Sequence, residues 1–160
     1  MTATLPPLNE ADIYGMNDAL VEFLKQTEAT TALIIDKGGF MITHQGDAKR
    51  FDLTTIAALA SGAYMANETI ATLVHESKFK SVYQQGEKYS MFVSCIDEHC
   101  LLVIIFAAKL SVGAVKYFAA PASEKIAGQL QSALERDPDS GFDLSALNVA
   151  DTESLFRKRV

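Results

Sequence analysis

The sequence predicts an α+β fold in which a helix, two strands, a second helix, three strands and a third helix follow one another. Three observations lead to this prediction. Three long segments repeat apolar residues at helical spacing, and the short segments between them are rich in apolar and β-branched residues. The strands within each group are joined by links no longer than tight turns. Because parallel strands need long crossovers, the short links predict an antiparallel sheet.

Each expected helix begins just after a polar side chain that can cap the free amides of its first turn. The expected helices are residues 10–26 after Asn9, 53–74 after Asp52, and 112–135 after Ser111. Pro121 lies inside the last segment. Because proline lacks the amide proton and its ring clashes with the preceding turn, we expect a kink there or a break into two helices.

A β-hairpin is expected after the first helix. Residues 32–35 form a short apolar run, residues 36–39 have the composition of a tight turn, and residues 40–44 alternate in side-chain type. Gly38 and Gly39 suit a turn that needs positive φ.

Three further strands are expected at residues 79–85, 89–96 and 100–106. The last is apolar at every position, which predicts a central strand covered on both faces. The first is mostly polar, which favours an edge position. In such an edge, we expect a proline at Val82 to remove a donor that would pair with a partner strand.

The second helix has an unusual composition. Small residues crowd its middle and few positions are charged, so it is apolar on most sides and is expected to be buried on most sides. Small side chains also let another helix approach closely. Together with the open edge that carries Phe79 and Tyr83, this apolar surface predicts a protein partner.

Charge and length exclude several classes of protein. Lys and Arg number 14 against 20 Asp and Glu, and this net charge of -6 argues against a nucleic-acid surface. The longest apolar run, residues 101–108, is too short to insert into a membrane. No basic and apolar leader resembles a signal peptide, so a cytoplasmic location is expected. The expected divisions are a leader at 1–8, one domain at 9–135, and a linker and C-terminal tail at 136–160.

No catalytic or cofactor-binding motif is recognisable. Nucleotide-binding glycine loops and the nucleophile elbow are missing, so we expect no enzyme activity, no catalytic residues and no cofactor. The group Cys95, Asp97, His99 and Cys100 is half of a zinc site at most, so a turn carrying two small core cysteines is the favoured interpretation. The two cysteines could also face each other and oxidise, although a reducing compartment disfavours this.

The hairpin read as ALIIDKGGFMI at 32–42 resembles the opening hairpin of Roadblock-type dynein light chain domains. The alanine-rich helix at 53–74, the strand at 101–106 and the residues SVGAV at 111–115 resemble the bacterial, MglB-like branch of that family. The resemblance covers residues 10–134. It rests on pattern and order, because the family has no catalytic signature.

The resemblance implies a profilin-like sandwich, with the second helix on one face of a five-stranded antiparallel sheet and the other two helices on the opposite face. Family members dimerise through the strand that matches 79–85 and through the second helix. The implied dimer interface consists of Phe79, Ser81, Val82, Tyr83, Ala63 and Ala66. For the partner-facing side of the same helix, we expect Tyr64 and Glu68.

The resemblance also implies a function. The family regulates or scaffolds small Ras-like GTPases, and bacterial relatives such as MglB act largely by rearranging the catalytic residues of the GTPase itself. We therefore expect a non-catalytic homodimeric regulator of a small GTPase. Two alternatives are a structural adaptor in a larger complex and a sensor that binds a small ligand on a profilin-like sheet.

Overall fold

The computed structural model describes residues 5–136, and all eight expected elements are present. The helices are α1 (Glu10–Thr27), α2 (Leu53–Leu73) and α3 (Val112–Glu135). The strands are β1 (Thr31–Asp36), β2 (Met41–Gly46), β3 (Ser81–Gln84), β4 (Tyr89–Cys95) and β5 (Cys100–Ala107). The largest difference in length is in β3, which has four residues in place of the seven at 79–85.

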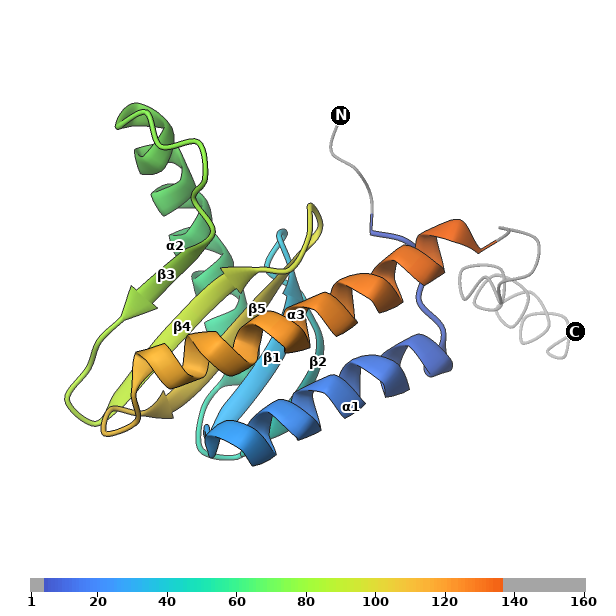
Figure 1. Ribbon diagram of the computed structural model, residues 1–160, viewed down its shortest axis with the longest axis horizontal. Helices are drawn as coiled ribbons and strands as arrows, with labels where there is room; N and C mark the ends of the chain where they lie inside the picture. Colours follow the sequence, from blue (N-terminus) through green and yellow to red (C-terminus); the bar gives the residue numbers. More distant parts are fainter. Residues whose placement is uncertain (1–4, 137–160) are drawn as a thin grey trace, which may run out of the picture.

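The five strands form one antiparallel sheet in the order β2-β1-β5-β4-β3 (Figure 1). The expected central strand, β5, lies in the middle, and seven of its eight residues are buried. The expected edge strand, β3, lies at one end, where it pairs with β4 alone. The hydropathy of each strand therefore predicts its place in the sheet correctly.

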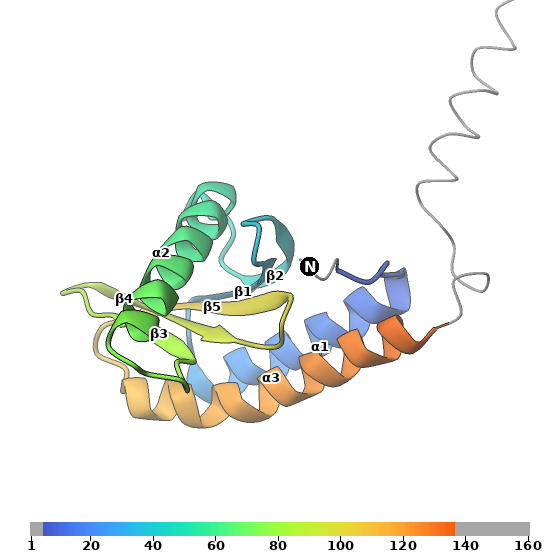
Figure 2. The same ribbon diagram turned by 90° about the horizontal axis from the view of Figure 1, so that it is seen from above.

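Helices cover both faces of the sheet. Helix α2 lies on one face, while α1 and α3 lie side by side on the other (Figure 2). Alternate side chains of β1 separate into two cores, with Ala32 and Ile34 facing α1 and α3, and Leu33 and Ile35 facing α2. This is the three-layer arrangement that we expected, and the fold class is confirmed.

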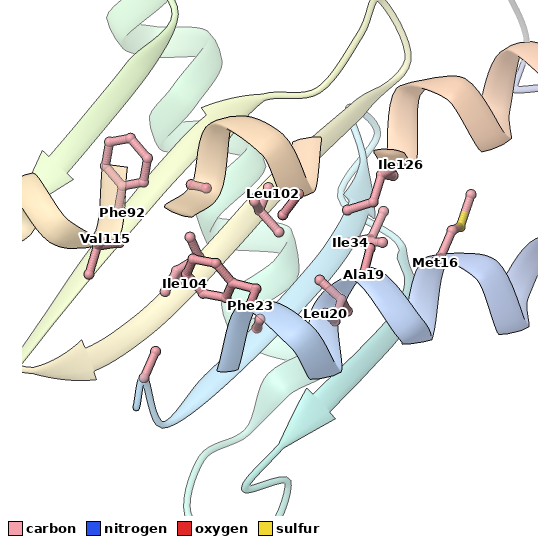
Figure 3. Close-up of a cluster of buried hydrophobic side chains, with 14 of the residues drawn as sticks. Met16, Ala19, Leu20, Phe23, Ile34, Phe92, Leu102, Ile104, Val115 and Ile126 are labelled. Atoms are coloured by element: carbon pink, nitrogen blue, oxygen red, sulfur yellow. The ribbon is translucent and has the colours of Figure 1, made fainter. Parts of the chain in front are cut away.

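The larger core lies between the sheet and the α1–α3 pair. Figure 3 shows Leu20 and Phe23 of α1 meeting Ile34, Leu102 and Ile104 of the sheet. On α3, Val115, Ala119, Ala122, Ile126, Leu130 and Ala133 are buried at helical spacing. Because both helices bury one continuous stripe, they pack against the sheet and against each other.

Helix α3 continues through Pro121 as a single helix, so the expected break is absent. Pro121 is exposed, whereas Ala122 and Ile126 beyond it pack into the core. One lost amide hydrogen bond does not outweigh the burial that continues on both sides of the proline.

A buried ion pair, which the sequence pattern did not indicate, joins the ends of α1 and α3. The Asp12 side chain is 1% exposed, and Arg136 Nη2 donates to its Oδ1 and Oδ2 at 2.7 and 2.9 Å. Gln129 Nε2 and the Asn9 amide also donate to this carboxylate. Burial alone would raise the pKa of Asp12, but these hydrogen bonds outweigh it and hold the pKa below its usual value. Arg136, expected to open the linker, is thus tied to the domain.

The rest of the expected leader and tail, residues 1–4 and 137–160, lies outside the described residues. Within residues 5–136, no helix is both long and apolar enough to cross a membrane.

Candidate partner-binding surface

Helix α2 buries only one side, which corrects the expectation that it is buried on most sides. Its buried residues, all on the side facing the sheet, are Leu53, Ala57, Ala60, Ser61, Tyr64 and Ala71. The remaining surface exposes several large apolar side chains: Leu59, Met65, Ile70 and Leu73 are 48–74% exposed. Its only charged residue is Glu68. An exposed helix surface with one charge among 21 residues is typical of an interaction site.

The β1–β2 hairpin anchors α2 on the sheet. Ser61 Oγ donates to the Lys37 carbonyl at 2.6 Å. Gly39 has φ of 94°, and a Cβ atom there would lie 3.1 Å from Ala58 Cα. A side chain at position 39 would therefore be strained and would push the helix away, so this turn needs glycine.

Tyr64 faces the sheet, so our expectation that it faces a partner is wrong. Its side chain is among the most buried in the chain, at 1% exposed, and its ring centroid lies 5.1 Å from that of Phe79. Burial, followed by the neighbouring Cys95, raises the pKa of Tyr64 well above its usual value. Phe79 is half-buried, and its contact with Tyr64 lies within the chain. Glu68, by contrast, is exposed, as are Ala63 and Ala66.

Along the outer edge of β3, only every second residue points its main-chain amide and carbonyl groups away from β4, where another strand could pair with them. The Cys95 amide donates to the Lys80 carbonyl at 2.9 Å, and Ser81, Val82 and Tyr83 pair with Ser94, Val93 and Phe92. Because hydrogen-bonded pairs alternate along an antiparallel ladder, the Val82 amide points inward to β4. The amides of Ser81 and Tyr83 point outward. A proline at Val82 would therefore damage the sheet itself, contrary to our expectation.

A groove of about 370 Å³ connects the exposed side of α2 with this edge of the sheet. Ile56, Leu59 and Ala63 of α2 line one wall, and Gln84 of β3 and Met91 of β4 lie on the other. The groove makes α2 and β3 parts of one surface. Ile56 and Leu59 were not among the expected interface residues, although the low charge of the whole helix was the pattern that could have indicated them.

The comparisons with known proteins assign this fold to a family. A model of the Roadblock/LC7 domain matches residues 16–106, more than half of the chain. The chain belongs to the Roadblock/LC7 domain family. The resemblance noted in the hairpin and the alanine-rich helix is confirmed. A comparison with curated protein sequences found no match.

Solved structures of MglB proteins are similar to this roadblock chain. An MglB with a tetrameric arrangement is 30% identical over 82% of this chain and 98% of its own, with a TM-score of 0.76. The gliding protein MglB from Thermus thermophilus is 32% identical over 81% and 98%, with a TM-score of 0.74. Myxococcus xanthus MglB is 26% identical over 73% and 95%, with a TM-score of 0.69. The MglB-like branch is therefore supported.

The opposite edge of the roadblock sheet is less suited to pairing. In β2, Thr43 pairs with Ile34 and Met41 pairs with Ile35, which leaves Ile42 as a bulge. A bulge bends an edge strand and disfavours its extension by another strand. The β3–β4 register, in contrast, has no shift. Of the two edges, β3 is the one whose geometry continues most readily into a neighbouring strand.

The cysteine and histidine cluster has a structural explanation. Asp97 Oδ1 accepts hydrogen bonds from the amides of His99 and Cys100 at 2.8 and 2.9 Å, which shapes the β4–β5 turn. Cys95 contacts the core under α2 and Cys100 the core under α1 and α3, so they lie on opposite faces of the sheet and cannot form a disulfide. Burial, with the charges of Asp97 and Asp36, raises the pKa of Cys100 to about 12. Among residues 5–136, no three metal-ligating side chains form a site.

Proposed function

We propose that this roadblock protein is a homodimer that regulates a small Ras-like GTPase through surface contacts, without catalytic groups of its own. The observation that carries the proposal is the apolar surface of α2, which the groove joins to the open edge of β3. The likeness to MglB proteins supports the same role.

A two-fold axis beside β3 would satisfy both features at once. Antiparallel pairing of β3 with its copy would supply partners for the outward amides of Ser81 and Tyr83. It would place the two α2 helices on the same face of a ten-stranded sheet. Each helix could then cover the groove beside Leu59 and Ala63 of the other.

Ser81→Pro is expected to weaken this dimer by about tenfold or more. It removes one outward donor from each copy, and each main-chain hydrogen bond contributes roughly 0.5–1.5 kcal/mol. Ser81 is the first residue of β3, a position where proline is tolerated within its own chain. The dissociation constant is measured by analytical ultracentrifugation.

Ser81→Ala is the matched control, because it shortens the side chain and keeps the amide. It should dimerise like the wild type. The dimer proposal fails if the wild-type protein is a monomer at micromolar concentration, and the β3 geometry fails if Ser81→Pro dimerises as tightly as Ser81→Ala.

The arginines of the described region are held by contacts within the chain, which agrees with an indirect effect on the GTPase. Arg50 forms an ion pair with Asp47 at 3.2 Å and donates to the Tyr89 hydroxyl. Arg136 is held by the buried Asp12. Neither is poised to insert into another protein's nucleotide site. This supports stimulation by contacts that rearrange the catalytic residues of the GTPase.

Single-turnover GTP hydrolysis tests the proposal, using a small GTPase that co-purifies with the protein from its native cell. The protein alone should neither bind nor hydrolyse GTP, because its sequence has no phosphate loop. It should change the hydrolysis or exchange rate of the GTPase. Arg50→Ala, Arg157→Ala and Arg159→Ala should retain the effect, since an inserted arginine is worth about 10³–10⁵ in rate where one is used.

Two outcomes would change this proposal. If one arginine variant abolishes stimulation while binding persists, the chain supplies a catalytic arginine. If no small GTPase binds the purified dimer, the structural adaptor becomes the better description.

A further inference from the structure

A second groove, of about 450 Å³, lies on the face of the sheet that carries α3. It is formed by the β4–β5 turn, the second half of α3 and the extended segment before α1. Leu130 and Leu134 of α3 and Pro6 supply apolar walls. Leu134 is 52% exposed, whereas Val115, Ala119, Ala122, Ile126, Leu130 and Ala133 of the same helix are buried. The groove therefore presents apolar surface that the described residues leave uncovered.

The rim of this groove is acidic. Asp97 and Glu98 line it from the β4–β5 turn, and the Glu98 side chain is 69% exposed, with its carboxylate 3.4 Å from His99 Nε2. From α3, Gln131 lines the groove and donates to the Glu135 carboxylate at 2.8 Å. The last turn of α3 contains no basic residue, and Arg136, which follows it, is paired with the buried Asp12. Such a groove suits a segment with apolar side chains next to cations.

The chain itself contains such a segment. Residues 155–159 read LFRKR, which places two large apolar side chains directly before the only run of three basic residues in the sequence. We propose that residues 155–159 bind in the α3 groove of their own chain. In this arrangement, Leu155 and Phe156 contact the wall formed by Leu134, and Arg157 to Arg159 lie on the acidic rim.

The connection is long enough for this contact. Arg136, the last described residue, follows the groove-lining Leu134 by two positions, and 18 residues separate it from Leu155. Eighteen residues span about 27 Å even at the short rise of a helix. Pro138 and Gly141 occur in the sequence between α3 and this segment, and both are residue types that favour turns.

Charge distinguishes this groove from the one beside α2. The α2 groove is lined by apolar and neutral polar side chains and has no carboxylate among its lining residues. A basic segment gains nothing there, whereas the α3 groove provides opposite charge together with an apolar wall. This interaction is independent of the proposed GTPase function, because no partner protein takes part in it.

The absence of tryptophan from the sequence allows a sharp test with the full chain. Phe156→Trp introduces a single fluorophore into the binding segment. Tyr117→Trp, on the exposed side of α3 at a residue that is 73% exposed, is the reference for a solvent-facing ring. The Phe156→Trp protein should emit at shorter wavelength than the reference and should be quenched more slowly by acrylamide.

A second substitution, added to the Phe156→Trp protein, tests whether the segment binds in the α3 groove. Leu134→Asp and Glu98→Lys, each combined with Phe156→Trp, should return the emission and quenching to the values of the exposed reference. Tyr117→Asp, a matched change at the other end of α3, should leave the shift intact. Without a reporter, amide hydrogen exchange across residues 127–134 should be faster in Phe156→Ser than in the wild type.

Three results would overturn the proposal. One is quenching of the Phe156→Trp protein as fast as the reference, together with unchanged hydrogen exchange in Phe156→Ser. Another is a blue shift that survives Leu134→Asp. The third is a shift that grows with protein concentration, which would assign the segment to a second copy. None of these measurements involves GTPase binding, so failure here leaves the proposed function untouched.

Discussion

Arg136→Met is expected to destabilise the folded protein by about 3 kcal/mol, the low end of the usual cost of removing one partner from a buried ion pair, because the Arg136 side chain is itself 25% exposed. The change leaves the Asp12 carboxylate, which is 1% exposed, without its cation and with fewer donors. The methionine stem keeps most of the apolar contacts of the arginine. Urea denaturation at one fixed protein concentration measures the difference, because the stability of a dimer depends on concentration.

Arg50→Met is the matched control, since it removes the same side chain from the exposed ion pair with Asp47. That pair should contribute no more than about 1 kcal/mol. The double variant Asp12→Leu/Arg136→Met should recover much of the loss, because it no longer buries an unpaired charge. Equal effects of Arg136→Met and Arg50→Met would contradict a stabilising role for the buried pair.

The same pair predicts a pH dependence. The pKa of Asp12 is lower in the folded state than in the unfolded chain, where an aspartate has a pKa of about 3.9. Its contribution is therefore present above pH 4 and is lost as the pH falls through the folded pKa. In Arg136→Met, burial acts without the compensating cation and raises the pKa of Asp12. The stabilities of the wild type and the variant should thus begin to converge above pH 4, where Asp12 of the variant takes up its proton, and should converge further as the pH falls through the lower pKa of Asp12 in the wild type.

Tyr64→Ala should cost about 3–5 kcal/mol, the range for truncating a large aromatic side chain in a core. Tyr64 fills the space between α2 and the sheet and packs on Phe79. Truncation leaves a cavity beneath the helix that carries the proposed interface. Denaturant unfolding measures the loss, and Tyr117→Ala, at a tyrosine that is 73% exposed, should change stability by less than about 0.5 kcal/mol.

The roles of Tyr64 and Glu68 in folding and in partner binding can be distinguished by measuring both the unfolding free energy and GTPase binding of their alanine variants. Glu68→Ala should leave the unfolding free energy nearly unchanged, because its side chain is exposed. If Tyr64→Ala folded with wild-type stability and lost only GTPase binding, the tyrosine would face the partner after all, and its assignment to the core would be wrong.

The helices and strands, their order along the chain and the ranking of the strands by burial could all be predicted from the amino-acid sequence. Helix starts at Asn9, Asp52 and Ser111 depend on local hydrogen bonds within three residues, so they can be recognised from neighbouring positions. The central place of β5 follows from its unbroken apolar run, because only a strand covered on both faces tolerates one. The edge position of β3 was predicted from its mostly polar side chains, because an edge strand is less completely covered.

The side of α2 that meets the sheet, and the contacts between groups far apart in the sequence, could not be predicted in this way. Helix α2 is apolar nearly all round, so its sequence contains no polar side to show that Tyr64 points inward while Ala63 and Ala66 point outward. Asp12 and Arg136 stand 124 positions apart, and their pairing depends on two helices lying side by side. The orientation of α2 and the Asp12–Arg136 pair both result from packing between helices and strands, so the residues next to them in the sequence do not indicate them.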